Sequence, residues 1–145
     1  MNENKLIVPV EKRDLAWARE TFANDRFATE AAGVVIEEAA DQVCRCSMKI
    51  TPVHRNAAGG VMGGAMFTLA DLTFAVAANF GGRMTVSISS NISFIGPCKG
   101  EVLYSTAKCV KAGRSTCFYE VDIVDDLGNK VAVVTFTGFV KDQSF

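Results

Sequence analysis

One stretch of the chain is apolar on every helical face. Positions 61–80 read VMGGAMFTLADLTFAVAANF and lack the polar stripe of a surface helix, which is typical of a helix enclosed by other elements. The run from Met62 to Phe80 is almost long enough to span a bilayer, but it contains Asp71, and no second such run accompanies it. We therefore expect a helix that begins near Gly63 and is buried inside a globular protein.

Alternating apolar and polar positions predict strands on both sides of this helix. The alternation is clearest where Cys44, Cys46 and Met48 share one face, which indicates that the two cysteines pack in the core. Glycine, proline, asparagine and aspartate residues separate the later strands as turns. The expected strands begin at residue 33 and cover residues 42–50, 83–94, 102–110, 114–124 and 130–140, the first two forming a hairpin.

Short helices are expected before the first strand. Residues 11–23 place apolar side chains among charged ones at helical intervals, which predicts an amphipathic opening helix. Asn24 and Asp25 interrupt this pattern, and we expect them to cap a short second turn over residues 26–31.

These elements predict an α+β protein with a hotdog arrangement, in which an antiparallel sheet wraps around one long central helix. A single domain over residues 1–145, with the short helices at its amino-terminal end, accounts for the whole pattern. A helix that is apolar all round also needs cover on the open side of the sheet. We therefore expect a homo-oligomer, either a dimer or a dimer of dimers that forms a homotetramer.

Composition and charge exclude several classes of protein. A chain of 145 residues that is 49% apolar fits one domain with a real core. Fifteen basic and sixteen acidic residues give no general attraction to nucleic acid or to an anionic membrane. Five cysteines without a C-x-x-C pair, and an amino terminus without a signal-peptide pattern, predict a reduced, cytoplasmic setting. A single histidine leaves no histidine-cluster metal site, so we expect neither a metal nor a cofactor.

Asp71 is the clearest candidate for chemistry, because it is the only charged residue between Arg55 and Arg83. A buried carboxylate is costly unless it is paired or used. The bare amides of Gly63 and Gly64 at the expected helix start would admit close approach of a ligand, and a carboxylate with such amides suggests acyl chemistry. The alternatives are an aspartate bound to a local backbone group or an arginine, and glycines that only permit close packing.

The spacing of these groups favours a site shared by two chains. Asp71 lies eight residues beyond Gly63, about 12 Å along a helix. Attack distances are only about 3 Å, so one carbonyl cannot contact both groups of one chain. If both groups serve one substrate, they come from different subunits.

Nearly the whole chain resembles the hotdog thioesterases of the phenylacetate-degradation type. The resemblance is carried by HRNAAGGVMGGAMFTLAD, TVSISSNISFIGPCKGEVL and KAGRSTCFYEVDIVDDLGNKVAVVTFT, in this order. In that family an asparagine precedes a histidine-glycine-glycine at a helix start, and an acidic residue follows within the helix. The matching positions here are Asn56, Met62, Gly63, Gly64 and Asp71, with methionine in place of the histidine.

The resemblance implies hydrolysis of an acyl-CoA thioester, with CoA as part of the substrate. The Gly63 amide would bind the thioester oxygen, and Asp71 of the partner chain would act as nucleophile or general base. Asn56 would orient water or the carbonyl, and Ser87 would assist the water. Substrate contacts are further expected from Met62, Gly64, Arg114, which would meet the CoA phosphates, and His54, although a lone histidine beside an arginine is more often structural.

Two other functions stay open from the sequence. A noncatalytic acyl-CoA binding module is suggested by Met62, because methionine cannot donate or accept a proton. A hotdog dehydratase or hydratase would need a histidine and acid pair on the acyl chain, and the sole histidine, His54, lies in the preceding loop. For a thioesterase, the acyl group could be aromatic, such as phenylacetyl or hydroxybenzoyl, or a short to medium aliphatic chain.

Overall fold

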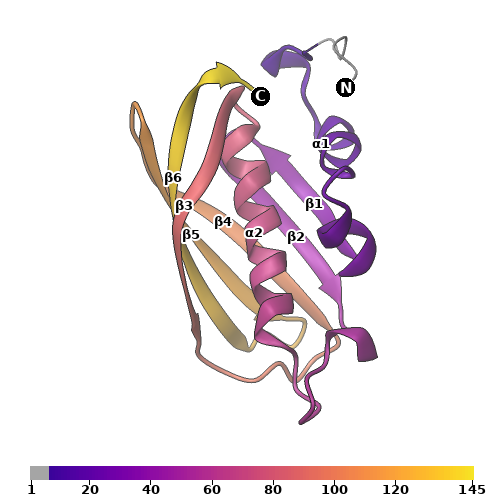
Figure 1. Cartoon of the computed structure of the whole chain (residues 1–145). Coiled ribbons are helices and arrows are strands. Elements are labelled where there is room, and N and C mark those ends of the chain that lie inside the picture. Colours follow the sequence, from indigo (N-terminus) through magenta and orange to yellow (C-terminus); the bar gives the residue numbers. More distant parts are fainter. Residues whose placement is uncertain (1–6) are drawn as a thin grey trace.

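The computed structural model describes residues 7–145 and shows an antiparallel sheet curved around one long helix (Figure 1). This is the hotdog arrangement that the sequence predicts. The helical elements are η1 (Val10–Lys12), α1 (Leu15–Phe22), η2 (Phe27–Ala31), η3 (Pro52–His54) and α2 (Gly63–Asn79). The strands are β1 (Val34–Ala40), β2 (Val43–Lys49), β3 (Arg83–Phe94), β4 (Val102–Ala112), β5 (Thr116–Asp125) and β6 (Lys130–Ser144).

The six strands follow the order β1-β2-β4-β5-β6-β3, and every neighbouring pair is antiparallel. The expected hairpin of β1 and β2 is confirmed, and Gln42 makes its turn with a positive φ of 61°. The expected start of β5 at Arg114 is wrong, because the amide of Gly113 donates to the Thr116 carbonyl and leaves Arg114 in the turn. This order makes β1 and β3 the two edge strands of the sheet.

The core lies between α2 and the concave face of the sheet. Phe74 of α2 stacks on Phe136 of β6 with ring centroids 4.6 Å apart, and Tyr119 of β5 meets Phe74 edge to face. Cys44 and Cys46 of β2 are buried as free thiols, as expected for core residues. Alternation along the strands therefore directs one continuous apolar face toward the helix.

The prediction that α2 is enclosed on every side is correct only in part. One stripe of the helix is exposed or half-exposed, and it consists of Gly64, Thr68, Asp71, Ala75 and Ala78. These positions recur every three or four residues and so share one face of the helix. The reason is that the sheet wraps only one side of α2, while α1 and η2 flank it beside β1 (Figure 1). No helix within residues 7–145 is both long and apolar enough to cross a membrane.

The amino-terminal segment differs from the single opening helix expected over residues 11–23. The Asp14 side chain accepts a hydrogen bond from the Trp17 amide at 2.8 Å and so starts α1 as a separate helix after η1. The expected cap at Asn24 and Asp25 is also wrong, because no side chain caps the start of η2. The Asp25 side chain is thereby left available for another contact.

Arg13 closes the carboxyl end of α2. Its Nη1 atom donates to the carbonyls of Asn79 at 3.3 Å and Phe80 at 3.0 Å, where the helix leaves acceptors unpaired. The guanidinium also lies 4.4 Å from the centre of the Trp17 ring. Burial lowers the pKa of Arg13. This contact anchors the segment before α1 on the end of the central helix.

Asp125, buried at the end of β5, joins two loops through its carboxylate. Its Oδ2 atom accepts from the amides of Lys99 and Gly100 and from Nδ2 of Asn129, and its Oδ1 atom accepts from the amides of Leu127 and Asn129. Burial alone would raise the pKa of Asp125. The hydrogen bonds, that from the Asn129 side chain foremost, favour the carboxylate more strongly and hold the pKa well below its usual range.

This network predicts a specific loss of stability in acid. The folded protein holds Asp125 ionised, so its stabilisation is complete above the unfolded pKa of about 3.9 and declines as pH falls toward the lower folded pKa. Asp125→Asn should lower the melting temperature at neutral pH and weaken the further decline below about pH 4. Circular dichroism melts across pH check this. The control Asp122→Asn, at an exposed position of the same strand, should have the melting temperatures of wild type at every pH. Wild-type melting temperatures for Asp125→Asn would contradict this account.

Candidate active site

The start of α2 presents two unpaired backbone amides. Met62 precedes the helix with extended backbone, and its amide donates to the His54 carbonyl at 2.8 Å. The next two amides, those of Gly63 and Gly64, have no acceptor within residues 7–145. They lie at the positive end of the helix dipole, so they can bind an oxygen that carries negative charge.

A side chain at Gly63 would require the Phe94 ring of β3 or the helix start to move, because the ring lies over this glycine. A Cβ atom built on Gly63 would lie 2.7 Å from Cζ of Phe94. The neighbouring Gly64 is less restricted, since its Cβ would meet only Cε of Met62, at 3.6 Å. The two glycines therefore differ: the first packs closely under Phe94, while the second lies on the exposed stripe of α2.

Asn56 shapes the loop before the helix. Its Oδ1 atom accepts from the amides of Ala58 at 3.0 Å and Gly60 at 3.1 Å, and a bridge between Arg55 and Val61 closes the base of the loop. The oxygen is thus committed within the chain. The exposed Nδ2 group can still donate to a water or a carbonyl.

His54 is buried, with both ring nitrogens engaged. The Thr51 amide donates to Nδ1 at 3.0 Å, so Nε2 carries the proton and donates to the Ala32 carbonyl at 2.6 Å. This geometry favours the structural interpretation of His54. Because neither nitrogen is left for a substrate, a direct substrate contact by the ring loses its support.

Asp71 lies on the uncovered stripe of α2 and makes no hydrogen bond or ion pair with any residue in 7–145. It borders a pocket of about 370 Å³. Partial burial among its neighbours raises the pKa of Asp71, and the nearby Asp25 carboxylate raises it further. The other residues that line the pocket are Arg26, Phe27, Ala28, Phe67, Thr68 and Leu72.

This pocket combines two carboxylates, those of Asp25 and Asp71, with two aromatic rings. Phe27 and Phe67 provide apolar walls beside Asp71, so a compact acyl group fits the chemistry of the lining. The sequence did not indicate Asp25 or Phe27 as site residues. These two residues approach Asp71 only in the folded protein, where η2 packs beside α2. The sequence pattern predicted only a helix cap at Asp25.

Ser87 lies on the edge strand β3. It is exposed and pairs with Gly138 of β6. Thr85, two residues earlier on the same strand face, is buried toward α2, so alternation directs Ser87 to the helix side as well. Ser87 therefore lies on the helix side of the sheet and makes no hydrogen bond to Asp71, and its assistance to the water stays a prediction.

Arg114 lies at the opposite end of the molecule from Gly63. Nη2 of Arg83, which follows the end of α2, donates to the Arg114 carbonyl at 2.7 Å. The 17 residues of α2 span about 25 Å, which separates this turn from the free amides at the helix start. Within one chain, the predicted residues therefore do not form one cluster. The amides lie at the start of α2, Asp71 lies at its middle, and Arg114 lies in a turn near its far end.

Comparison with known proteins identifies the family. Residues 58–140 match the family model of the thioesterase superfamily. The chain is 31% identical to acyl-coenzyme A thioesterase PaaI of Escherichia coli K12 over 121 residues, which are 81% of this chain and 86% of that protein.

Solved structures share the fold. The E. coli PaaI protein from the phenylacetic acid degradation operon has a TM-score of 0.78 at 24% identity, over 90% of this chain and 98% of that chain. A hypothetical thioesterase of Streptococcus pneumoniae TIGR4, solved with coenzyme A, has a TM-score of 0.77 at 30% identity, over 84% and 98%. With a family model that covers more than half of its length, this chain belongs to the thioesterase superfamily, as a hotdog-fold thioester hydrolase of the phenylacetate-degradation type.

Proposed function

We propose that the protein hydrolyses acyl-CoA thioesters to a free acid and CoA, at active sites shared by two chains. The observation that carries this proposal is the unpartnered Asp71 on the same open stripe of α2 as the free amide of Gly64, directly beside that of Gly63. The amides and the carboxylate are about 12 Å apart along one helix, too far to serve one carbonyl. Two copies related by a two-fold axis would bring each carboxylate to the other chain's amides.

The edge strand β3 supports such a dimer. Its free edge can pair with a second sheet, and it exposes the apolar side chains of Val86, Ile88 and Phe94. Phe94 also covers Gly63, so an interface on β3 would adjoin the amides. A second contact between dimers would give the homotetramer, and light scattering measures which of the two forms exists.

In the proposed reaction, the Gly63 amide donates to the thioester oxygen as negative charge develops on it. Asp71 of the other chain either attacks the carbonyl carbon, expelling the CoA thiolate and leaving a mixed anhydride for water to cleave, or removes a proton from the attacking water. Nδ2 of Asn56 and the hydroxyl of Ser87 would orient the water or the carbonyl. Arg114, near the carboxyl end of α2, would meet the CoA phosphates where this end of one chain's helix approaches the start of the other chain's helix.

The names of relatives support CoA as the carrier. The E. coli relative is named an acyl-coenzyme A thioesterase, and the S. pneumoniae thioesterase was solved with coenzyme A. The aromatic walls of the Asp71 pocket favour a compact aromatic or short aliphatic acyl group. Five free cysteines are consistent with the expected cytoplasmic setting, and catalysis without metal or cofactor stays part of the proposal.

A second candidate, a noncatalytic acyl-CoA binding module, has one observation in its favour. Met62 is 54% exposed at the helix start and has no ionisable group to assist a reaction. The same site would then bind acyl-CoA without turnover.

Release of free thiol from a panel of acyl-CoAs separates the two candidates. Wild-type protein should release CoA from at least one aromatic or short-chain thioester, and the rates rank the acyl groups. Binding of those thioesters by calorimetry without thiol release would instead support the binding module.

A further inference from the structure

We propose that Asp25 is a positioning residue for the reaction, whose charge acts through space on Asp71 and raises the pH that hydrolysis requires. The role rests on the proposed thioesterase function. Asp25 lies in the amino-terminal segment, between α1 and η2, which precedes the sheet and the central helix.

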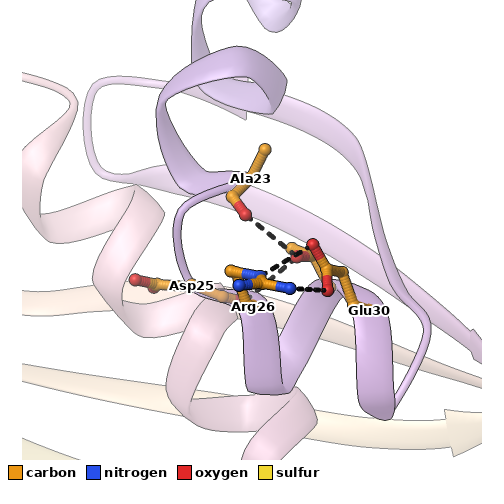
Figure 2. Close-up of polar contacts among 5 residues, drawn as sticks. Ala23, Asp25, Arg26 and Glu30 are labelled. Carbon is orange, nitrogen blue, oxygen red and sulfur yellow. Dashed lines mark hydrogen bonds and ion pairs between the residues drawn. The ribbon is translucent and has the colours of Figure 1, made fainter.

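Asp25 is aimed at the catalytic pocket. Its side chain points toward α2 in Figure 2, and it lines the same pocket as Asp71. It makes no side-chain hydrogen bond with any residue that the structure describes, so its charge is not neutralised locally.

The backbone of this segment holds Asp25 in place. The Asp25 amide donates to the Phe22 carbonyl at 3.0 Å, and the Asp25 carbonyl accepts from both the amide and the hydroxyl of Thr29 at 3.0 Å. The hydroxyl of Thr29 also reaches the Ala23 carbonyl at 3.3 Å. These bonds fix the turn between α1 and η2, and with it the origin of the side chain.

The one cation beside the pair is engaged elsewhere. Nε and Nη2 of Arg26 each donate to the Glu30 carboxylate at 3.0 Å, and Figure 2 shows this pair turned away from Asp25. A guanidinium bound to its own carboxylate at two points offers little charge to another acid. The two aspartates therefore line the same partly apolar pocket, without a free cation in its described lining.

Apart from Arg26, no other charged group lines this pocket within residues 7–145 of one chain. Asp71 is the only charged residue of α2, and Phe27, Ala28, Phe67, Thr68 and Leu72 are uncharged. The buried face of the sheet meets α2 with neutral side chains, including the cysteines and Tyr119, while Asp125 binds its own loop. In a partly desolvated pocket, the negative charge of one carboxylate opposes ionisation of a neighbouring carboxyl group. In agreement, the pKa of Asp71 is raised by desolvation and then by Asp25, and desolvation raises the pKa of Asp25.

Carbon-13 NMR of aspartate carboxyl groups tests this directly on the intact protein, with Asp71→Asn identifying the Asp71 signal. In Asp25→Asn, we expect Asp71 to titrate at lower pH than in wild type, and added salt should reduce the difference. Glu20→Gln, which removes a carboxylate of α1 outside this pocket, should leave the titration unchanged. Asp25→Ser provides a second neutral variant should Asp25→Asn fold poorly.

The pH profile of kcat/KM supplies the functional readout. Its acid limb should move to lower pH in Asp25→Asn, a shift that a purely structural role would not cause. An unchanged Asp71 titration in a folded variant of an active enzyme would overturn this inference alone. Absence of thioester hydrolysis by wild type at every pH would overturn the proposed function, and this role with it.

Discussion

Asp71→Asn is expected to reduce thioester hydrolysis by about 10²- to 10⁴-fold, the range associated with loss of a positioned general base. The reason is that asparagine keeps the shape of the side chain but can neither attack the carbonyl nor accept the proton of water. Thiol release under saturating substrate measures the loss, which should fall on kcat. Binding of the thioester should persist.

The same substitution should leave the folded protein at least as stable as wild type. A carboxyl group whose folded pKa is raised costs stability at pH values above its titration, because the unfolded chain releases the proton more readily. Removing this charge relieves that cost at neutral pH. Asp122→Asn is the matched control with full activity, and an Asp71→Asn protein with wild-type kcat would rule out the catalytic role.

Gly63→Ala is expected to reduce kcat by about 10²- to 10³-fold, the loss associated with removal of one oxyanion donor. The added methyl group would meet the Phe94 ring at 2.7 Å, so either the ring or the helix start has to move. Movement of the helix start would displace the amide that is proposed to bind the thioester oxygen, and movement of the ring would change the apolar surface beside that amide. Stopped-flow thiol release and thermal melts together distinguish lost catalysis from lost folding.

Gly64→Ala is the matched control for this substitution. Its methyl group would lie 3.6 Å from Met62, an ordinary contact, and alanine favours a helix over glycine by up to about 1 kcal/mol. We expect a smaller loss of kcat than in Gly63→Ala, because within the described chain the added methyl group meets only Met62, and equal or higher stability. If Gly63→Ala were as active as Gly64→Ala, close packing of Phe94 on Gly63 would not be needed to position the proposed oxyanion donor. Partial rescue of Gly63→Ala by Phe94→Leu would assign the defect to the ring.

Much of the fold could be predicted because its signals are local. The apolar run predicted α2 within a residue of its start at Gly63, and alternation predicted β3 over its full extent, Arg83–Phe94. The errors occurred where a single hydrogen bond decides a boundary. Asp14 divides the opening helix by binding the Trp17 amide. An aspartate directly before Leu15 is a helix start signal, but the helical pattern of residues 11–23 led to a single longer helix.

The site was less predictable because its contacts are tertiary. The carboxylate and the glycines stood out by their isolation, but the sequence could not indicate that one stripe of α2 stays open. Asp25 and Asp71 are 46 positions apart and meet only because η2 packs beside α2. His54 shows the opposite case: it was predicted as a substrate contact, but its ring is buried and bonds to the Thr51 amide and the Ala32 carbonyl.

Subunit complementation tests the central claim most directly, that Asp71 and Gly63 of different chains form one site. Asp71→Asn and Gly63→Ala chains, each nearly inactive alone, would be co-expressed in equal amounts. If the site is shared, half of the randomly formed dimers are hybrids with one intact site of two, so about a quarter of wild-type activity should return. If both groups act within one chain, every site keeps a defect, and activity no higher than that of the separate variants would contradict the account.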